Sequence, residues 1–163
     1  MIYLFTGQPG SGKTTLAKWL KEAFSKSQPI DSDRQFFLVD GDDMRRISNN
    51  KDYSDAGRKR NIGEAFAIAK YLDEYDNYDV IVSMVSPFKE LRDELKSIAN
   101  VVEIYVHTQD IRGREQFHVA NYEPPTENFI EIDTTDVGEM TSLNELLNKL
   151  IEQNAIPRNT ILN

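Results

Sequence analysis

The chain has 163 residues, the length of one domain with its own hydrophobic core. Hydrophobic residues make up 39% and charged residues 28%, which excludes collagen-like, low-complexity and wholly disordered chains. Nineteen Lys and Arg against 27 Asp and Glu give a net charge of −8, which argues against binding duplex nucleic acid through its phosphates. The sequence has no cysteine, which excludes a disulfide framework, a thiolate zinc site and a cysteine nucleophile.

We expect a cytoplasmic protein without a membrane partner. Residues 1–5 are apolar, but they follow no basic leader and are too few for the apolar part of a signal peptide. The longest apolar run, at residues 80–85, is far shorter than the ~20 residues that a membrane-spanning helix needs. The absence of cysteine fits a reducing compartment.

Short apolar runs alternate with helically spaced apolar residues along the chain. The expected strands are 2–5, 36–39, 80–85, 101–106 and 129–132, and the expected helices are 13–24, 44–47, 58–72, 87–96 and 143–151. This alternation predicts an α/β fold: an open, mainly parallel five-stranded sheet with helices on both faces. We expect one domain over residues 1–153 and a loosely held tail over residues 154–163.

A glycine-rich motif lies between the first predicted strand and the first predicted helix. The run Gly7-Gln8-Pro9-Gly10-Ser11-Gly12-Lys13-Thr14 fits the phosphate-loop pattern G-x-x-x-x-G-K-[ST]. Its glycines let backbone N–H groups curl around phosphates, Lys13 reaches the β and γ phosphates, and Thr14 offers a hydroxyl to Mg²⁺. A chance glycine-rich turn is disfavoured, because the flanking elements also agree. The motif predicts an ATP and Mg²⁺ site in a P-loop fold, formed by Gly7, Gly10, Ser11, Gly12, Lys13, Thr14 and Thr15.

An acidic turn follows the second predicted strand, in Asp40-Gly41-Asp42-Asp43. Ligands of open parallel sheets bind beyond the carboxyl ends of the strands, so the position suits a site. The structural alternative is a cap on the next helix, made by Asp42 or Asp43. Beside a phosphate loop, the turn is predicted to supply a carboxylate for Mg²⁺ and a base for the acceptor. Asp40 and Asp42 are the candidates, and the sequence leaves their two roles open.

Six basic residues fall within residues 45–60 of this acidic chain. A solvated surface is the favoured interpretation for Lys51, Lys59 and Arg60. Arg45 and Arg58 flank the acidic turn, and planar guanidinium groups suit bidentate binding of phosphate or sulfate oxygens. These two arginines predict a substrate that carries its own anion.

Five motifs occur in an order that one family of P-loop kinases shares. They are the loop 7–14, Val39-Asp40-Gly41-Asp42-Asp43-Met44-Arg45, Ser54-Asp55-Ala56-Gly57-Arg58-Lys59-Arg60-Asn61-Ile62, Val85-Ser86-Pro87-Phe88 followed by Arg92-Asp93, and Tyr122-Glu123-Pro124-Pro125. In these motifs the sequence resembles the adenylylsulfate kinases. That family transfers the ATP γ-phosphate to the 3′-hydroxyl of adenosine 5′-phosphosulfate.

The resemblance implies roles for individual residues. Carried over by position, it implies that the phosphosulfate substrate is held by Arg45, Arg58, Asn61, Val85 and Ser86. It also implies that Asp40 and Asp42 serve the acceptor hydroxyl and Mg²⁺. Ser86 has been considered a phosphorylated intermediate in this family, although direct in-line transfer is simpler. The structural alternative for Ser86 and Pro87, a strand end with a helix N-cap, is compatible with binding.

The region after residue 108 departs from the family. The family's basic lid, with its R-D-x-K-G-L-Y pattern, is replaced by Arg112-Gly113-Arg114-Glu115-Gln116-Phe117-His118, which runs almost directly into Tyr122. Arg114 is our candidate for the lid arginine, in preference to Arg112, and Phe117 for the phenylalanine that stacks on adenine. Gly57 replaces a family acid. This shortened lid leaves the identity of the acceptor open.

Three functions are therefore weighed. The leading one is an adenylylsulfate kinase that uses ATP and Mg²⁺. The second is a related kinase for another small-molecule hydroxyl, such as that of a nucleoside or nucleotide. The third is a nucleotide-dependent regulatory binder, which is disfavoured because Asn148-Lys149-Leu150-Ile151 fails the guanine motif N-K-x-D at its last position. A homodimer is compatible with the sequence, which leaves the oligomeric state open.

Overall fold

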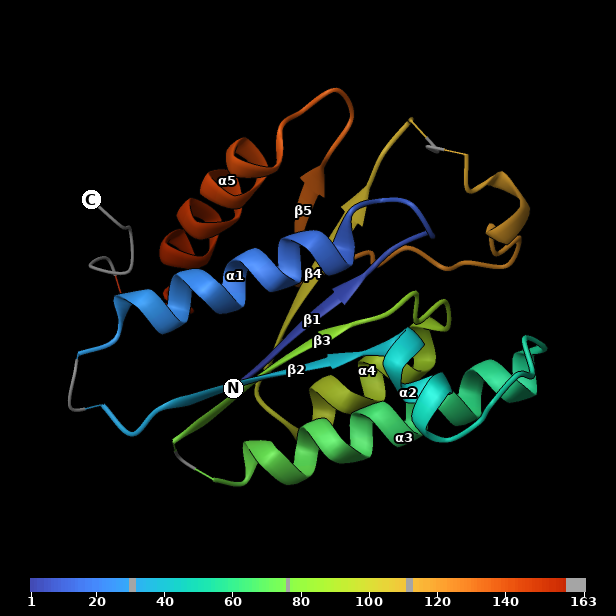
Figure 1. Cartoon of the computed structure of the whole chain (residues 1–163), viewed down its shortest axis with the longest axis horizontal. Helices are drawn as coiled ribbons and strands as arrows, with labels where there is room; N and C mark the ends of the chain where they lie inside the picture. The colour runs from blue at the N-terminus through green and yellow to red at the C-terminus, as the bar shows by residue number, and fades with distance from the viewer. Residues whose placement is uncertain (30–31, 76, 111–112, 158–163) are drawn as a thin grey trace.

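The computed structural model describes residues 1–29, 32–75, 77–110 and 113–157. Strands and helices alternate along these residues, which confirms the predicted α/β fold (Figure 1). The strands are β1 (Ile2–Thr6), β2 (Gln35–Asp40), β3 (Tyr78–Ser83), β4 (Val101–His107) and β5 (Phe129–Asp133). The helices are α1 (Lys13–Ser27), α2 (Gly41–Ile47), α3 (Asp55–Asp73), α4 (Lys89–Ile98), the 3₁₀ turn η1 (Glu115–Phe117) and α5 (Glu139–Glu152).

The five strands form one parallel sheet in the order β2-β3-β1-β4-β5. The chain builds β2 and β3 on one side of β1, and β4 and β5 on the other. The direction of winding therefore reverses beside β1, and the loops that leave the carboxyl ends of the strands diverge there. Such a reversal is where open parallel sheets bind ligands. Figure 1 shows the loop after β1, the start of α2 and the η1 segment at this end of the sheet.

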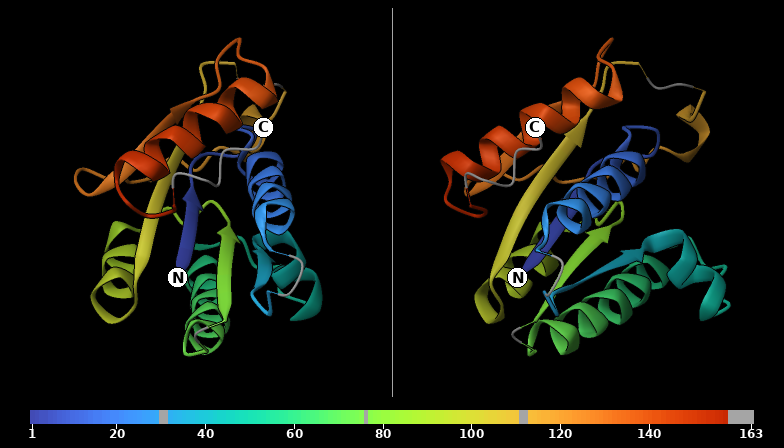
Figure 2. Two further views of the ribbon diagram at one scale, coloured as in Figure 1. Left: turned by 90° about the vertical axis from the view of Figure 1, so that its left-hand side faces the viewer. Right: turned by 60° about the vertical axis from the view of Figure 1, so that its left-hand side comes forward.

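Alternate residues of β1 feed two hydrophobic cores. Tyr3 and Phe5 pack in a cluster with α1 and α5, whereas Ile2 and Leu4 pack in a cluster with α3 and α4. The two turned views in Figure 2 agree with this division of the helices between the faces of the sheet. Both faces of β1 are buried, as expected for a central parallel strand. No helix within the described ranges is long and apolar enough to span a membrane.

The start of α2 corrects one sequence expectation. The helix begins at Gly41, and its N-cap is Asp40, whose Oδ1 accepts a hydrogen bond from the Asp42 backbone N–H at 2.9 Å. Neither Asp42 nor Asp43 is the cap, so that alternative is wrong. In the same way Ser54 caps α3, accepting from the Gly57 N–H, so that this helix begins at Asp55, before the expected start at residue 58. Both caps extend these helices toward the N-terminus beyond their apolar patterns.

Strand β3 ends earlier than the apolar run in the sequence predicts. The strand ends at Ser83, while the sequence pattern extended it to residue 85. Ser86 has a φ of 40°, which turns the chain away from the sheet, and α4 begins only at Lys89 with Phe88 as its N-cap. The expected start of that helix at Pro87 is therefore wrong, and so is a capping role for Ser86.

The start of the expected tail is part of the core. Ile156 is buried within the cluster under α1 and α5, and the Tyr3 hydroxyl donates to the Ala155 carbonyl at 3.4 Å. The expectation of a loosely held tail is thus wrong for these two residues. Residues 158–163, to which it also applied, lie outside the described residues.

Candidate active site

A cavity of about 1050 Å³ lies at the carboxyl ends of the strands. This volume is at the upper end of the range for small-molecule sites. Four segments line it, namely parts of the phosphate loop, residues from Asp40 to Ile62, residues 83–87, and residues 114–118. The predicted site residues in its lining are Gly10, Gly12, Lys13, Thr14, Thr15, Asp40, Asp42, Arg45, Arg58, Asn61, Val85, Ser86, Arg114 and Phe117. Gly7 and Ser11 are outside the lining.

The charge of the lining is opposite to that of the chain. Six Lys and Arg side chains line the cavity, but only two carboxylates, those of Asp40 and Asp42. The chain as a whole carries a net charge of −8. A cationic pocket in an acidic protein favours small anionic ligands without attracting duplex nucleic acid.

The phosphate loop has the backbone that its glycines permit. Gly7, Gly10 and Gly12 have φ values of 146°, 84° and 90°, which side chains rarely allow. At Gly7 a Cβ would lie 2.0 Å from the Val106 carbonyl oxygen, so β4 leaves no space for one. Gly12 is the N-cap of α1 and provides no capping side chain. The first N–H groups of α1 therefore remain available for an anion.

Lys13 is buried at the floor of the cavity, with 7% of its surface exposed. Its Nζ donates to the Gln8 carbonyl at 2.7 Å and to Ser11 Oγ at 3.4 Å. Burial lowers the pKa of Lys13 to about 8, and the nearby carboxylates of Asp40 and Asp42 oppose that shift only in part. A buried lysine beside a phosphate-binding loop is suited to an anion that restores its full charge.

Thr14, Asp40 and Ser83 form a cluster of oxygen atoms beside the loop. Thr14 Oγ1 donates to Asp40 Oδ2 at 2.9 Å and lies 3.1 Å from Ser83 Oγ. Because Thr14 has one hydroxyl proton and the carboxylate takes it, Ser83 donates to Thr14. The sheet register explains the cluster, since Asp40 and Ser83 are cross-strand partners at the ends of β2 and β3. Hydroxyl and carboxylate oxygens are the ligands that Mg²⁺ prefers, so the cluster fits this ion.

Arg45 from α2 and Arg58 from α3 line the cavity around the ring of Tyr53. Their Cζ atoms are 4.3 Å and 5.8 Å from the ring centroid. Arg45 Nη1 donates to the Asp52 carbonyl at 2.7 Å, and Arg58 Nε donates to the Tyr53 carbonyl at 2.9 Å. Burial and the neighbouring Arg45 lower the pKa of Arg58. Two guanidinium groups held this close favour an anion between them.

Asn61 and Ser86 place buried polar atoms at the cavity. Asn61 Nδ2 donates to the Gly41 carbonyl at 3.1 Å, while Asn61 Oδ1 and Ser86 Oγ have no hydrogen-bond partner among the described residues. Ser86 also has a φ of 40°, an uncommon conformation for a residue with a side chain. Buried polar atoms are nearly always paired in native proteins, so these two are expected to pair with a ligand or an ordered water.

The other basic residues of the 45–60 region divide into two groups. Lys59 pairs with Glu90 at 2.7 Å and Arg60 pairs with Glu64 at 2.9 Å, both on exposed surface, in line with the solvated interpretation. The Lys51 side chain is exposed as well, in line with the solvated interpretation, and it also lines the cavity.

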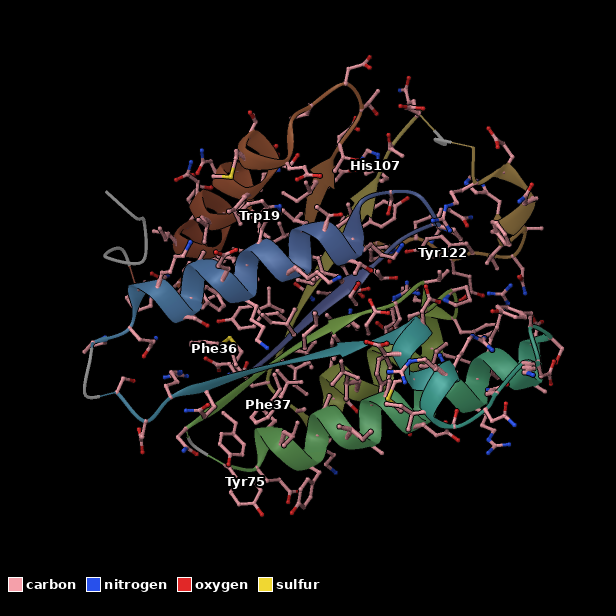
Figure 3. All side chains as sticks on the ribbon, viewed as in Figure 1. Trp19, Phe36, Phe37, Tyr75, His107 and Tyr122 are labelled. Atoms are coloured by element: carbon pink, nitrogen blue, oxygen red, sulfur yellow. The ribbon has the colours of Figure 1, made fainter. Side chains whose placement is uncertain are left out.

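The first part of the lid segment, residues 113–123, is exposed, and hydrogen bonds hold its second part against the rest of the fold. Arg114 and Phe117 are exposed on the cavity side, with the Arg114 Cζ 5.9 Å from the Phe117 ring centroid. Tyr122, labelled in Figure 3, forms a hydrogen bond with Thr6 Oγ1 at 2.9 Å. Since Thr6 Oγ1 donates to the Val85 carbonyl at 2.8 Å, Tyr122 is the donor to Thr6. Arg112, the rejected candidate for the lid arginine, lies outside the described residues.

Arg92 connects the lid segment to the segment that carries Ser86. It is fully buried and pairs with the buried Glu103 at 2.6 Å. Its Nη1 donates to the Ser86 carbonyl and its Nη2 to the Glu123 carbonyl, each at 2.6 Å. A buried ion pair of this kind is stable only when its remaining donors are satisfied, and here they fix Ser86 relative to Glu123.

The sequence did not indicate several residues of the cavity lining, among them Arg46, Asn49, Asn50 and His118. Three other missed residues make contacts that matter for the site. Tyr53 lines the cavity between the two arginines, and its signal was an aromatic residue directly before the capping Ser54. Ser83 could not be identified as a site residue from the sequence, because only the sheet register places it beside Asp40. Gln8, an unconstrained position of the loop motif, contacts both Lys13 and the lid segment.

Comparisons with known proteins agree with this geometry. The family model described as adenylylsulphate kinase matches residues 1–118. An adenylyl-sulfate kinase of Geotalea uraniireducens is 33% identical over 110 residues, a match that covers 65% of this chain and half of that protein. An adenylyl-sulfate kinase of a Picosynechococcus species is 30% identical over 173 residues, covering 91% of this chain and 92% of that protein.

Solved structures show a similar fold. The adenosine phosphosulfate kinase of Mycobacterium tuberculosis, solved in complex with AMPPNP and APS, superposes with a TM-score of 0.77. The match covers 92% of this chain and 96% of that chain, at 20% sequence identity. At that identity the likeness concerns the fold, and the family rests on the sequence matches.

Proposed function

The chain belongs to the adenylylsulphate kinase family, and from that premise we propose that it transfers the γ-phosphate of ATP to the 3′-hydroxyl of adenosine 5′-phosphosulfate (APS). One observation carries the proposal. A single cationic cavity is lined both by the phosphate loop and by the Arg45–Tyr53–Arg58 group, which together provide cationic groups for two anionic nucleotides.

The donor side would hold ATP. The loop amides and the uncapped start of α1 bind the phosphates, and Lys13 moves from the Gln8 carbonyl to phosphate oxygens. Thr14 and Asp40 are the residues that would hold Mg²⁺, with Ser83 positioning Thr14. Bound there, Mg²⁺ would neutralise charge on the β and γ phosphates.

The acceptor side would hold the phosphosulfate. Arg45 and Arg58 would bind its anionic oxygens. The buried atoms Ser86 Oγ and Asn61 Oδ1 would form hydrogen bonds with it. The exposed ring of Phe117, which lines the cavity, would stack on an adenine base.

Asp42 is the carboxylate left for the acceptor hydroxyl. Asp40 is engaged by Thr14 and by the Asp42 backbone N–H, whereas the Asp42 side chain is exposed at the cavity. We therefore assign Mg²⁺ to Asp40 and the acceptor proton to Asp42. Ser86 is buried and held in an unusual backbone conformation, which favours direct in-line transfer over phosphorylation of its hydroxyl.

The test is identification of the product by mass spectrometry after incubation with ATP, Mg²⁺ and APS. The wild-type chain should convert APS to its 3′-phosphate. Asp42→Asn should lower kcat by about 10²–10⁴-fold, the usual contribution of a general base. Asp43→Asn is the matched control, because Asp43 is a neighbouring exposed carboxylate outside the cavity lining. Equal kcat values for Asp42→Asn and Asp43→Asn would contradict the assignment of the base.

A further inference from the structure

Gln8 joins the phosphate loop to the lid segment. Its Nε2 donates to the Val119 carbonyl at 2.8 Å, and its Oε1 accepts from the Val119 N–H at 3.0 Å. A backbone N–H only donates and a carbonyl only accepts, so Val119 determines which end of the amide is which. Val119 is buried and lies 111 residues away in the sequence, so this pairing is a tertiary contact.

The same residue also contacts Lys13. Lys13 Nζ donates to the Gln8 carbonyl at 2.7 Å. A bound triphosphate offers Lys13 charged oxygens, which are stronger acceptors than a neutral carbonyl. Lys13 then turns to the phosphates, and the loop backbone is held by its own N–H groups on those phosphates. Nucleotide binding therefore changes how Gln8 is held.

Val119 lies at the boundary between the exposed part and the anchored part of the lid segment. Beyond Val119 the segment is anchored, through Tyr122 to Thr6 and through the Glu123 N–H to the Pro87 carbonyl at 2.9 Å. Before Val119 it carries Arg114 and Phe117, which are exposed on the cavity side. The position of Val119 thus limits where Arg114 and Phe117 can reach.

We propose that Gln8 is a positioning residue that couples nucleotide binding in the phosphate loop to the placement of the lid segment. The inference rests on the proposed function for its nucleotide site, and it does not depend on which acceptor is used. Gln8 reaches Lys13 through its carbonyl and Val119 through its side chain, so one residue transmits the change.

Hydrogen exchange at the Val119 amide tests the coupling, with AMPPNP and Mg²⁺ as the probe. If nucleotide binding strengthens the two hydrogen bonds between the Gln8 side chain and the Val119 backbone, exchange of the Val119 amide should slow by about tenfold in the wild type. Gln8→Met keeps the length but loses both hydrogen bonds, and Gln8→Asn keeps the amide but cannot reach Val119. Both variants should show no slowing on nucleotide addition. Gln153→Met, an exposed glutamine after α5, should behave as the wild type.

A kinetic measurement separates positioning from a general structural role. Gln8→Met should lower kcat about tenfold while the KM for ATP stays within about twofold, because the loop still binds phosphate. Should Gln8→Met fail to fold, Gln8→Asn makes the same comparison. Nucleotide-dependent slowing of Val119 exchange that survives in both variants would overturn the coupling. A wild type that shows the coupling but does not phosphorylate APS would contradict the acceptor assignment and leave the coupling supported.

Discussion

The two sides of the cavity are built in different ways. On the donor side, Lys13, Thr14 and Asp40 are placed by the ends of neighbouring strands and by the first turn of α1. On the lid side, Arg114 and Phe117 are exposed around a short 3₁₀ turn, and contacts distant in sequence hold the segment that follows. The donor side is therefore preorganised by the sheet, and the lid side depends on a few hydrogen bonds.

This difference predicts how each side responds to change. Removing a charge from the preorganised side should cost transition-state stabilisation directly, because such groups are already in position when the reaction begins. Removing a charge from the lid side should cost less, since an exposed side chain must first be ordered. Changes on the acceptor side should appear mainly as weaker binding.

The largest effect is expected for Lys13→Ala. It removes the buried charge that faces the transferring phosphate, and phosphoryl transfer depends almost wholly on such electrostatic stabilisation, so kcat should fall by about 10³–10⁵-fold. The fold should be retained, because the hydrogen bonds of the Lys13 ammonium group are made to loop atoms, the Gln8 carbonyl and Ser11 Oγ. Steady-state transfer assays and circular dichroism are the measurements. Near-normal turnover in a folded variant would refute the role of the phosphate loop.

Arg114→Ala is expected to have the next largest effect. Arg114 lines the cavity and is our candidate for the lid arginine, so its loss should act on the transition state and lower kcat by about 10²–10³-fold with small changes in either KM. The matched comparison is Arg34→Ala, which removes an arginine paired with Asp79 outside the cavity lining. An unchanged kcat for Arg114→Ala would show that the lid segment supplies no charge to the reaction.

A smaller effect on binding is expected for Arg45→Ala and Arg58→Ala. A charge-assisted hydrogen bond contributes about 1.5–3 kcal/mol, so each variant should raise the acceptor KM about 10- to 100-fold and leave the ATP KM almost unchanged. Arg60→Ala, on exposed surface with Glu64, is the control. If the ATP KM rose and the acceptor KM did not, both arginines would belong to the donor side.

The smallest effect is expected for the pH dependence of nucleotide binding. Burial lowers the pKa of Lys13 to about 8 in the free chain, and a bound triphosphate favours the protonated lysine and raises that pKa. The affinity for AMPPNP should therefore be highest, and independent of pH, well below pH 8. It should fall by up to about tenfold per pH unit as the pH rises through 8. Calorimetry measures this slope. Lys13→Arg should flatten it, because a guanidinium does not titrate there, and an identical slope in that variant would assign the effect to another group.

The donor side could be predicted from the sequence because its chemistry is local. Four fixed positions of the loop and the acidic turn after a strand identify Lys13, Thr14 and Asp40, and strand periodicity places them at one end of the sheet. The lid side could not be predicted in the same way. Gln8 and Arg92 act through partners 111 and 31 residues away, and a single sequence carries no signal for such pairs. The cap of α2 was also missed, because Asp42 and Asp43 match a cap as well as Asp40 does.

The central claim is that the cationic cavity selects APS as the acceptor. It is tested most directly by comparing kcat/KM for APS with kcat/KM for adenosine 5′-phosphate, nucleosides and other small hydroxyl compounds, with ATP as donor. Our account predicts that APS gives the highest value, by about tenfold or more over adenosine 5′-phosphate, because Arg45 and Arg58 bind the additional anionic group. A higher kcat/KM for any other acceptor would contradict it.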